Sequence, residues 1–215
     1  MLHRLPRRVR LVFGVTADPP ELAGDHAPLE EFVAYATDCR VSGQLSLPSG
    51  RLTDMLNAYE EFELVNVQLQ SLADGHVVNE PLVVLPRDEL VAVHAAGSAG
   101  HPASRTHTRA HRLVVRAQPY TIWGDLHALP GADPLASFHH RPPMVPLTDA
   151  WIAYELAGRT GRFQLGTLIV NRDLAESFER VADSGAEPPL MPAGESGPLT
   201  KDFTGELIRL EGQPG

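Results

Sequence analysis

The sequence contains little cysteine and no long apolar run, and each shortage excludes a class of structure. Cys39 is the single cysteine among 215 residues, which excludes an intrachain disulfide and a zinc site built from several cysteines. No apolar run approaches the roughly 18 residues that span a bilayer. The apolar stretch at residues 11–15 is too short for a signal peptide. We therefore expect a cytoplasmic protein without a membrane partner.

Basic residues are also scarce. The chain has 18 Lys and Arg against 27 Asp and Glu, a net charge of −9. A surface devoted to nucleic acid needs clustered cations, so this balance argues against such a protein, although it leaves room for a local basic patch. With 43% hydrophobic and 21% charged residues, the composition is typical of a globular protein.

One stretch of the chain resembles a second stretch further along. Residues 41–91 align with residues 122–178 when slips of one or two residues are allowed at expected turns. The alignment places Gly43 on Gly124, Pro48 on Pro130, Leu64 on Leu147, Asn66 on Asp149, and Arg87-Asp88 on Arg172-Asp173. The sequence thus predicts an internal duplication.

The hydrophobic pattern within each copy predicts mostly strands. Apolar residues alternate with polar ones, the period of a half-buried strand, except at two places. Leu52, Met55, Leu56 and Tyr59 share one face of a short helix. Asp133 and Pro134 are typical of a helix start. We predict a mainly β (α+β) fold: two tandem copies of a small antiparallel sheet or partly open barrel, each with one short helix.

These patterns also divide the chain into segments. Residues 171–183 are expected to form a terminal helix, and the Pro/Gly-rich end is expected to lack packed structure. The expected segments are an N-terminal arm (1–28), a first β-rich repeat (29–94), a mobile basic and His-rich linker (95–110), a second repeat (111–183) and the tail (184–215).

Two family resemblances follow from the strand plan. The strands around FELVNVQL and VVLPRDELVAV look like those of the Sm-like barrel, an RNA-binding ring, but the helical RLTDMLN interrupts that plan and the RNA-contacting motifs are not matched. The combination GQLSLPSGRLTDMLN, FELVNV and VVLPRDELV is similar to uncharacterised bacterial proteins with a domain of unknown function. This resemblance covers most of residues 40–175 and implies no activity, so no functional residue is carried over.

The most polar segment is residues 101–116, which contains Arg and His but no acid. On a helix His107 and His111 would lie at metal-ligand spacing, but the Glu of an HExxH motif is absent. On a strand His107, Arg109 and His111 would share one face and meet phosphate or carboxylate. The interpretation that the sequence favours over both is a flexible loop with incidental histidines. The candidate binding residues are Arg105, His107, Arg109, His111, Arg112 and Arg116.

The remaining polar and aromatic candidates are interpreted as structural. Arg87-Asp88 and Arg172-Asp173 are expected in turns or in ion pairs between the copies, and Trp123 and Trp151 as core or interface anchors. The carboxylates near the first helix are expected to form a solvated face. The same structural reading applies to a second basic group: His127, His139, His140 and Arg141.

The sequence favours a non-catalytic scaffold that binds a protein partner, or itself, through a strand edge or the groove between the copies. It contains no phosphate loop, dinucleotide fingerprint or GxSxG motif, and we expect no cofactor and no bound metal. The alternatives are a nucleic-acid or anion-binding protein that uses residues 101–116 and, third, a His-based metal-dependent enzyme.

Overall fold

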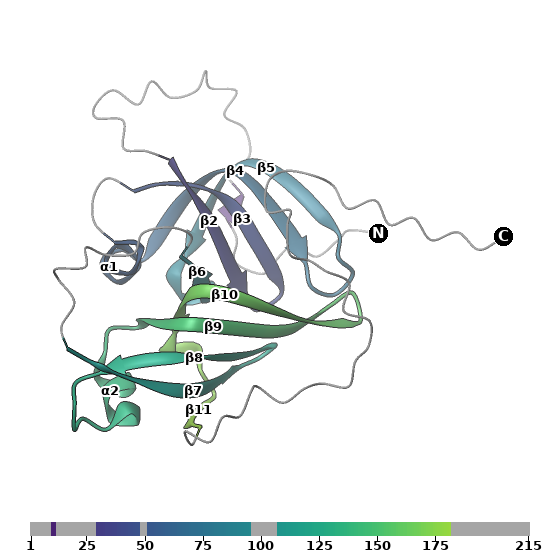
Figure 1. The fold of residues 1–215 in the computed structure, drawn as a ribbon. Helices are drawn as coiled ribbons and strands as arrows, with labels where there is room; N and C mark the ends of the chain where they lie inside the picture. Colours follow the sequence, from purple (N-terminus) through teal and green to yellow (C-terminus); the bar gives the residue numbers. More distant parts are fainter. Residues whose placement is uncertain (1–9, 12–28, 48–50, 96–106, 182–215) are drawn as a thin grey trace. The chain divides into compact units, whose positions relative to one another are not determined.

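The structure, a computed structural model, describes residues 10–11, 29–47, 51–95 and 107–181. These residues form one antiparallel sheet and two short helices (Figure 1). The sheet is open, with strand order β1-β5-β4-β3-β2-β6-β10-β9-β8-β7-β11. The mainly β prediction is therefore confirmed, in the form of an open sheet and not of closed barrels.

The elements of the sheet follow the same order in the two halves of the chain. The first half contains β2 (Leu29–Ala36), β3 (Cys39–Ser46), α1 (Leu52–Ala58), β4 (Glu61–Ser71), β5 (Val77–Pro86), the 3-10 turn η1 (Arg87–Glu89) and β6 (Leu90–His94). The second half contains β7 (Arg109–Ala117), β8 (Tyr120–Ala128), α2 (Pro134–His140), β9 (Met144–Leu156), β10 (Arg159–Asn171), the 3-10 turn η3 (Arg172–Leu174) and β11 (Ser177–Arg180). The short β1 (Arg10–Leu11) precedes both and pairs with β5. The common origin of the halves stays a prediction, because a shared order of elements does not measure ancestry.

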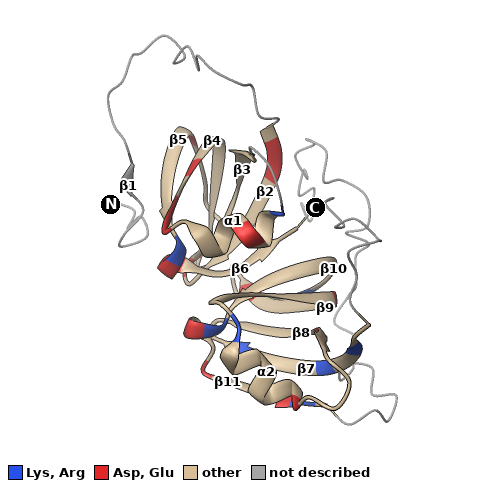
Figure 2. Ribbon diagram, turned by 90° about the vertical axis from the view of Figure 1, so that its left-hand side faces the viewer, with Lys and Arg blue, Asp and Glu red and all other residues tan. Residues whose placement is uncertain are grey.

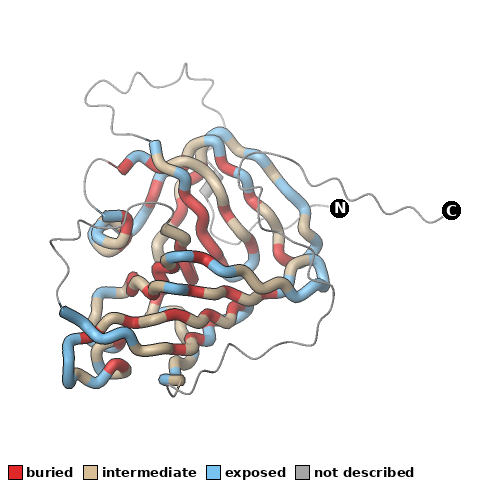
Figure 3. Tube along the Cα trace, in the orientation of Figure 1, coloured by how far each residue is buried: buried red, intermediate tan, exposed pale blue. Residues whose placement is uncertain are grey.

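The two halves join along the middle of the sheet. β6 pairs with β2 of its own half on one side and with β10 of the other half on the other side. Apolar residues at this junction are buried on both faces of the sheet, so β2 and β6 carry nearly continuous buried runs (Figure 3). The first core packs Phe32 and Ala34 of β2, whereas the second core packs Val33 and Tyr35. The two cores thus lie on opposite faces of one sheet.

A β-bulge occurs at the same place in both halves. The pairing register shifts beside Gly43 between β3 and β4, and beside Gly124 between β8 and β9. The opposing strands carry Asn66 and Asp149, both with positive φ (53° and 48°), which Asn and Asp tolerate better than most residues. A Cβ on Gly124 would lie 2.8 Å from the Cβ of Leu147. The sequence alignment pairs these same positions, Gly43 with Gly124 and Asn66 with Asp149.

Local signals explain several boundaries. Asp133 caps α2 by accepting hydrogen bonds from the backbone N–H groups of Leu135 and Ala136, and Pro134 begins the helix, as the sequence predicts. Helix α1 buries Leu52 and Leu56. In β4 the alternating residues Phe62, Leu64, Val67 and Leu69 are all buried.

The structure corrects two boundary predictions. The expected terminal helix is wrong: residues 172–174 form a 3-10 turn, and Ser177–Arg180 form β11, an edge strand paired with β7. The expected linker is too long, because β7 already begins at Arg109. Most of the arm, the core of the linker with Arg105, and the tail lie outside the described residues. Among the residues described, no helix is long and apolar enough to cross a membrane.

Candidate interaction surface

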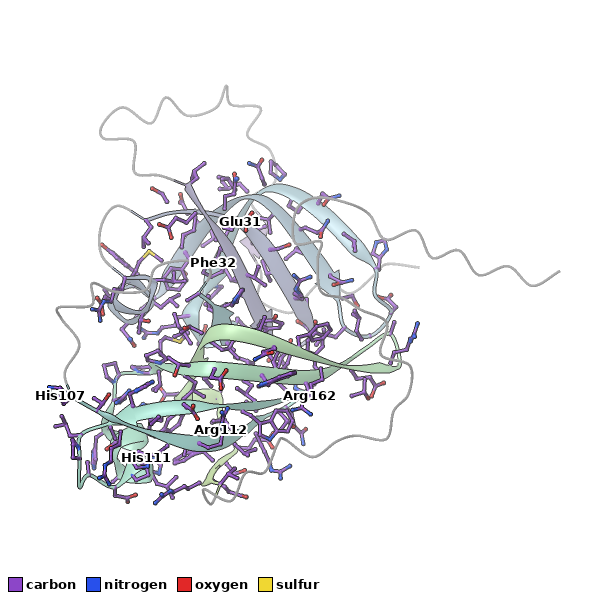
Figure 4. All side chains as sticks on the ribbon, in the orientation of Figure 1. Glu31, Phe32, His107, His111, Arg112 and Arg162 are labelled. Carbon is purple, nitrogen blue, oxygen red and sulfur yellow. The ribbon has the colours of Figure 1, made fainter. Side chains whose placement is uncertain are left out.

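Strand β7 separates the predicted binding residues onto two faces of the sheet. Leu113, Val115 and Ala117 point into the second core, and alternation along a strand places Arg109 and His111 on the same side as these residues. Arg112 and Arg116 lie on the opposite side. His107 and Arg109 are exposed, and Figure 4 shows His107 near the start of β7. Of the predicted stripe, Arg109 and His111 share a face of β7, whereas His107 precedes the strand; neither forms one patch with Arg112 and Arg116.

Arg112 is bound by two carboxylates of its own half. Its Nε lies 2.9 Å from Asp125 Oδ1, and its Nη2 lies 3.1 Å from Asp149 Oδ2. Its Nη1 also donates to the backbone carbonyl of Asp149, at 3.0 Å. Because Asp149 is the positive-φ residue of the bulge, Arg112 holds the bulge in place. Its charge is largely neutralised, which weakens the case for Arg112 as an anion ligand.

Two tryptophans lie side by side on the face opposite the second core. Trp123 of β8 and Trp151 of β9 are directly paired across the strands, and both are half-buried. The guanidinium carbon of Arg162, from β10, lies 4.6 Å from the ring centroid of Trp151 and 5.3 Å from that of Trp123. Both distances suit cation–π interactions. The tryptophans are thus not core residues, contrary to the first of the two predicted roles.

Residues of β7 and β8 extend the surface around the two tryptophans. Val114 and Arg116 of β7 lie on the same side of the sheet as the tryptophans. They pair across the strands with Trp123 and Thr121 of β8, respectively. Figure 2 shows basic segments on β7, and Figure 4 places Arg162 well away from His107 along the sheet. Arg116 is exposed, whereas Val114 and Thr121 are half-buried. We call the surface that these residues form the tryptophan face; it consists of Val114, Arg116, Thr121, Trp123, Trp151 and Arg162.

The Arg-Asp pairs occupy turns, as one of the two interpretations predicts. Arg87 donates from Nη1 to the backbone carbonyls of Asn57 and Tyr59 at the end of α1, at 3.3 Å each. Arg172 donates from Nη1 to the carbonyl of His139 near the end of α2. Each arginine thus stabilises the C-terminal end of the helix in its own half. The ion pair between Arg172 Nε and Asp173 Oδ1, at 3.5 Å, is local and does not join the halves.

The second basic group is tied together by structural contacts. His127 Nε2 lies 2.8 Å from Thr148 Oγ1, and Arg141 donates from Nη2 to the backbone carbonyl of His127. His139 packs edge-on against Phe178 of β11, with ring centroids 4.6 Å apart. Partial burial lowers the pKa of Arg141. These contacts support the structural interpretation of the group.

The junction between the halves contains a cluster of three tyrosines. The rings of Tyr35, Tyr120 and Tyr154 meet edge to face at 5.5 to 5.7 Å, and the Tyr120 hydroxyl donates to the Ala36 carbonyl at 2.5 Å. Burial raises the pKa of Tyr35 to about 12 and also raises the pKa values of Tyr120 and Tyr154. Cys39, on β3, is buried in the first core, and burial raises the pKa of its thiol to about 12.

The acidic side chains near α1 are spread over an exposed surface. Asp54, Glu60, Glu61 and Glu63 are exposed, as the predicted solvated face requires. Within residues 29–47, 51–95 and 107–181, no three His, Cys, Asp or Glu side chains gather as a metal site would need. Two shallow depressions, of about 350 and 250 Å³, are lined by residues of β3, α1, β4 and β5. Neither of the two lies between the halves.

Sequence reasoning missed Arg162 and the role of its two tryptophan partners. Arg162 sits between glycine and phenylalanine in a strand, and no local motif marks it. The available signal for the tryptophans was that Trp123 and Trp151 are chain neighbours of Ile122 and Ile152. Adjacent residues of a strand face opposite sides, so each tryptophan lies on the side away from its isoleucine.

Comparison with known proteins found no matching family model, no similar curated protein and no similar solved structure.

Proposed function

We propose that the chain is a non-catalytic binding protein whose tryptophan face recognises a protein partner. The observation that carries the proposal is the cross-strand pair of half-buried tryptophans with Arg162 placed over both rings, on a face that belongs to neither core of the described residues. Tryptophan and arginine are among the residues most enriched at the positions that dominate protein–protein binding energy. Here they are also held rigidly by neighbouring strands, so little side-chain entropy is lost on binding.

The charges around the surface favour a protein partner over nucleic acid. Arg112 is engaged by Asp125 and Asp149, and Arg109 and Arg116 lie on opposite sides of β7. A phosphate backbone requires several cations on one surface. A protein partner requires instead an apolar, aromatic centre with a polar rim, which Trp123 and Trp151 with Arg116 at the margin supply.

The test is recovery of partners by the full chain from its own cells. We expect one protein in stoichiometric amount, and we expect Trp151→Ala to weaken its binding by roughly 30-fold, as for residues that dominate an interface. Leu129→Ala is the matched control, since Leu129 is 57% exposed and lies outside the tryptophan face. Urea unfolding of both variants checks that each is folded. Equal recovery with Trp151→Ala and the control would contradict the proposal.

Nucleic-acid binding is the second candidate, because paired aromatic rings on an open sheet are also suited to stacking on bases. It ranks second because Arg162 already covers both rings. Titration of single-stranded RNA and DNA decides between the two. Binding that falls steeply between low and moderate salt and is lost in Trp151→Ala would favour nucleic acid, and no binding at either salt concentration removes it.

A further inference from the structure

The sheet ends in two edges of different character. At one end, β5 pairs with β4 along its length, and within the described part of the chain its outer side pairs with β1 alone, at Val83 and Val84. At the other end, β11 pairs with β7 and is the last strand of the described sheet. An open edge presents backbone N–H and C=O groups that another strand can pair with.

Within the chain, β6 and β10 already pair with each other, and these strands are the counterparts of the two edge strands, β11 and β5. β6 follows η1 in the first half as β11 follows η3 in the second, and both pair with the first strand of their half in matching register: Val93 opposite Ala34, and Phe178 opposite Val115. The outer side of β6 pairs with β10, with Val93 opposite Ile169. β10 in turn occupies in the second half the place of β5 in the first.

The register of the internal junction transfers directly to the two edges. Val84 of β5 and Ile169 of β10 are equivalent positions, because each lies three residues before the arginine, Arg87 or Arg172, that begins η1 or η3. The preceding residues, Val83 and Leu168, are likewise equivalent. Repeating the junction would therefore set Phe178 of one molecule opposite Val84 of another, and Glu179 opposite Val83. These are the two residues of β5 that β1 occupies.

We propose that a second copy of this chain binds head to tail, with its β11 pairing onto the β5 edge, and that β1 competes for the same edge. This assembly is independent of the tryptophan face. The operation is heterologous, since two different edges meet, so it can repeat from molecule to molecule. By pairing with Val83 and Val84, β1 limits the association, as other edge-covering devices do.

The side chains at the edges indicate that the association is weaker than the internal junction. Val84 is half-buried, whereas its counterpart Ile169 is fully buried by the first half. This apolar group gains burial when β11 pairs with β5. On the other strand, however, Ser177 and Glu176 stand where β6 has Ala92 and Val91, both buried. Less apolar area is therefore available to drive assembly.

The first experiment compares self-association by sedimentation over a wide concentration range. In the full chain, Arg10→Pro/Leu11→Pro removes both backbone N–H donors of β1, and Arg10→Ala/Leu11→Ala is the matched control that keeps them. We expect the proline variant to associate at about tenfold lower concentration, the change that loss of about one competing net hydrogen bond produces. The alanine variant should sediment like the natural chain. Circular dichroism confirms that both are folded.

The second experiment tests the register by disulfide formation in the proline variant. Glu179→Cys combined with Val83→Cys should yield a ladder of covalent multimers, because the two positions face each other across the proposed interface. Glu179→Cys combined with Val77→Cys, an exposed position further along β5, should not. Cys39 is buried and adds little background. Unchanged sedimentation of the proline variant, or equal cross-linking at Val77, overturns the proposal.

Discussion

Gly124 shows how one residue without a Cβ determines the path of a strand. It lies at the bulge between β8 and β9, where a Cβ would come within 2.8 Å of the Cβ of Leu147. Neither carbon is at the end of a flexible side chain, so the two backbones must move apart. We expect Gly124→Ala to lower the free energy of unfolding by about 1–3 kcal/mol, the range for overpacked cores, as measured by urea unfolding.

Gly166→Ala provides the control for this prediction. No atom lies within 4 Å of a Cβ at Gly166, which is an exposed position of β10. Alanine there fills open space, and it restricts the unfolded chain, so we expect a change of no more than about 0.5 kcal/mol in either direction. Equal losses of stability in both variants would mean that the contact with Leu147 does not set the requirement for glycine.

At the scale of elements, each short helix depends on an arginine from the following 3-10 turn. Helix α2 has seven residues, too few to be stable alone. Arg172→Met removes the donor to the His139 carbonyl while keeping the length of the side chain. We expect a loss of about 1–2 kcal/mol in the free energy of unfolding, because the donor is charged and only partly exposed. Arg159→Met, at an exposed position beside the β9–β10 turn, should change stability by under about 0.5 kcal/mol. A similar loss in both variants would contradict the capping role.

Most elements were predictable because their apolar residues keep one period along the chain. Buried and exposed residues alternate in β4 on either side of the bulge at Asn66, and α1 and α2 carry helix spacing or a helix start signal. The helix prediction for the segment after Asn171 is wrong because Leu174, Phe178 and Val181 have the spacing of a helix face, yet residues 177–180 pair with β7 as an edge strand. Tertiary pairing overrode local pattern there.

Side-chain partners were harder to predict than elements. The binding residues of β7 were grouped by closeness in sequence, but alternation along the strand separates Arg109 from Arg116, and Asp125 and Asp149 from two other strands engage Arg112. Arg162 contacts Trp123 and Trp151 because the register of the neighbouring strands β8, β9 and β10 places the three residues side by side. Such contacts depend on which strands are neighbours, and a single sequence does not specify that order.

At the scale of the whole molecule, strand pairing and side-chain hydrogen bonds join the two halves. Beyond the β6–β10 pairing, Asn57 of α1 donates to the Met144 carbonyl of β9 and accepts from the Met144 N–H, at 2.9 Å each. Asn171, which is almost fully buried, donates to the Arg87 carbonyl at 3.2 Å. Because these bonds and the tyrosine cluster cross the junction, neither half should remain folded when the other unfolds.

The chain provides a separate probe for each half. Trp123 and Trp151 report on the second half by fluorescence, and Cys39, which is 2% exposed, reports on the first half by thiol labelling. We expect both probes to give one urea midpoint, as for a two-state domain. Asn57→Ala should shift both midpoints together and cost about 2–3 kcal/mol, because it leaves the two backbone groups of Met144 without their partner. In Asn79→Ala, which removes only an exposed bond of 3.4 Å, the shift should stay under about 0.5 kcal/mol. Separate midpoints for the tryptophan and thiol probes would show instead that the halves fold independently and that the junction is only a contact between them.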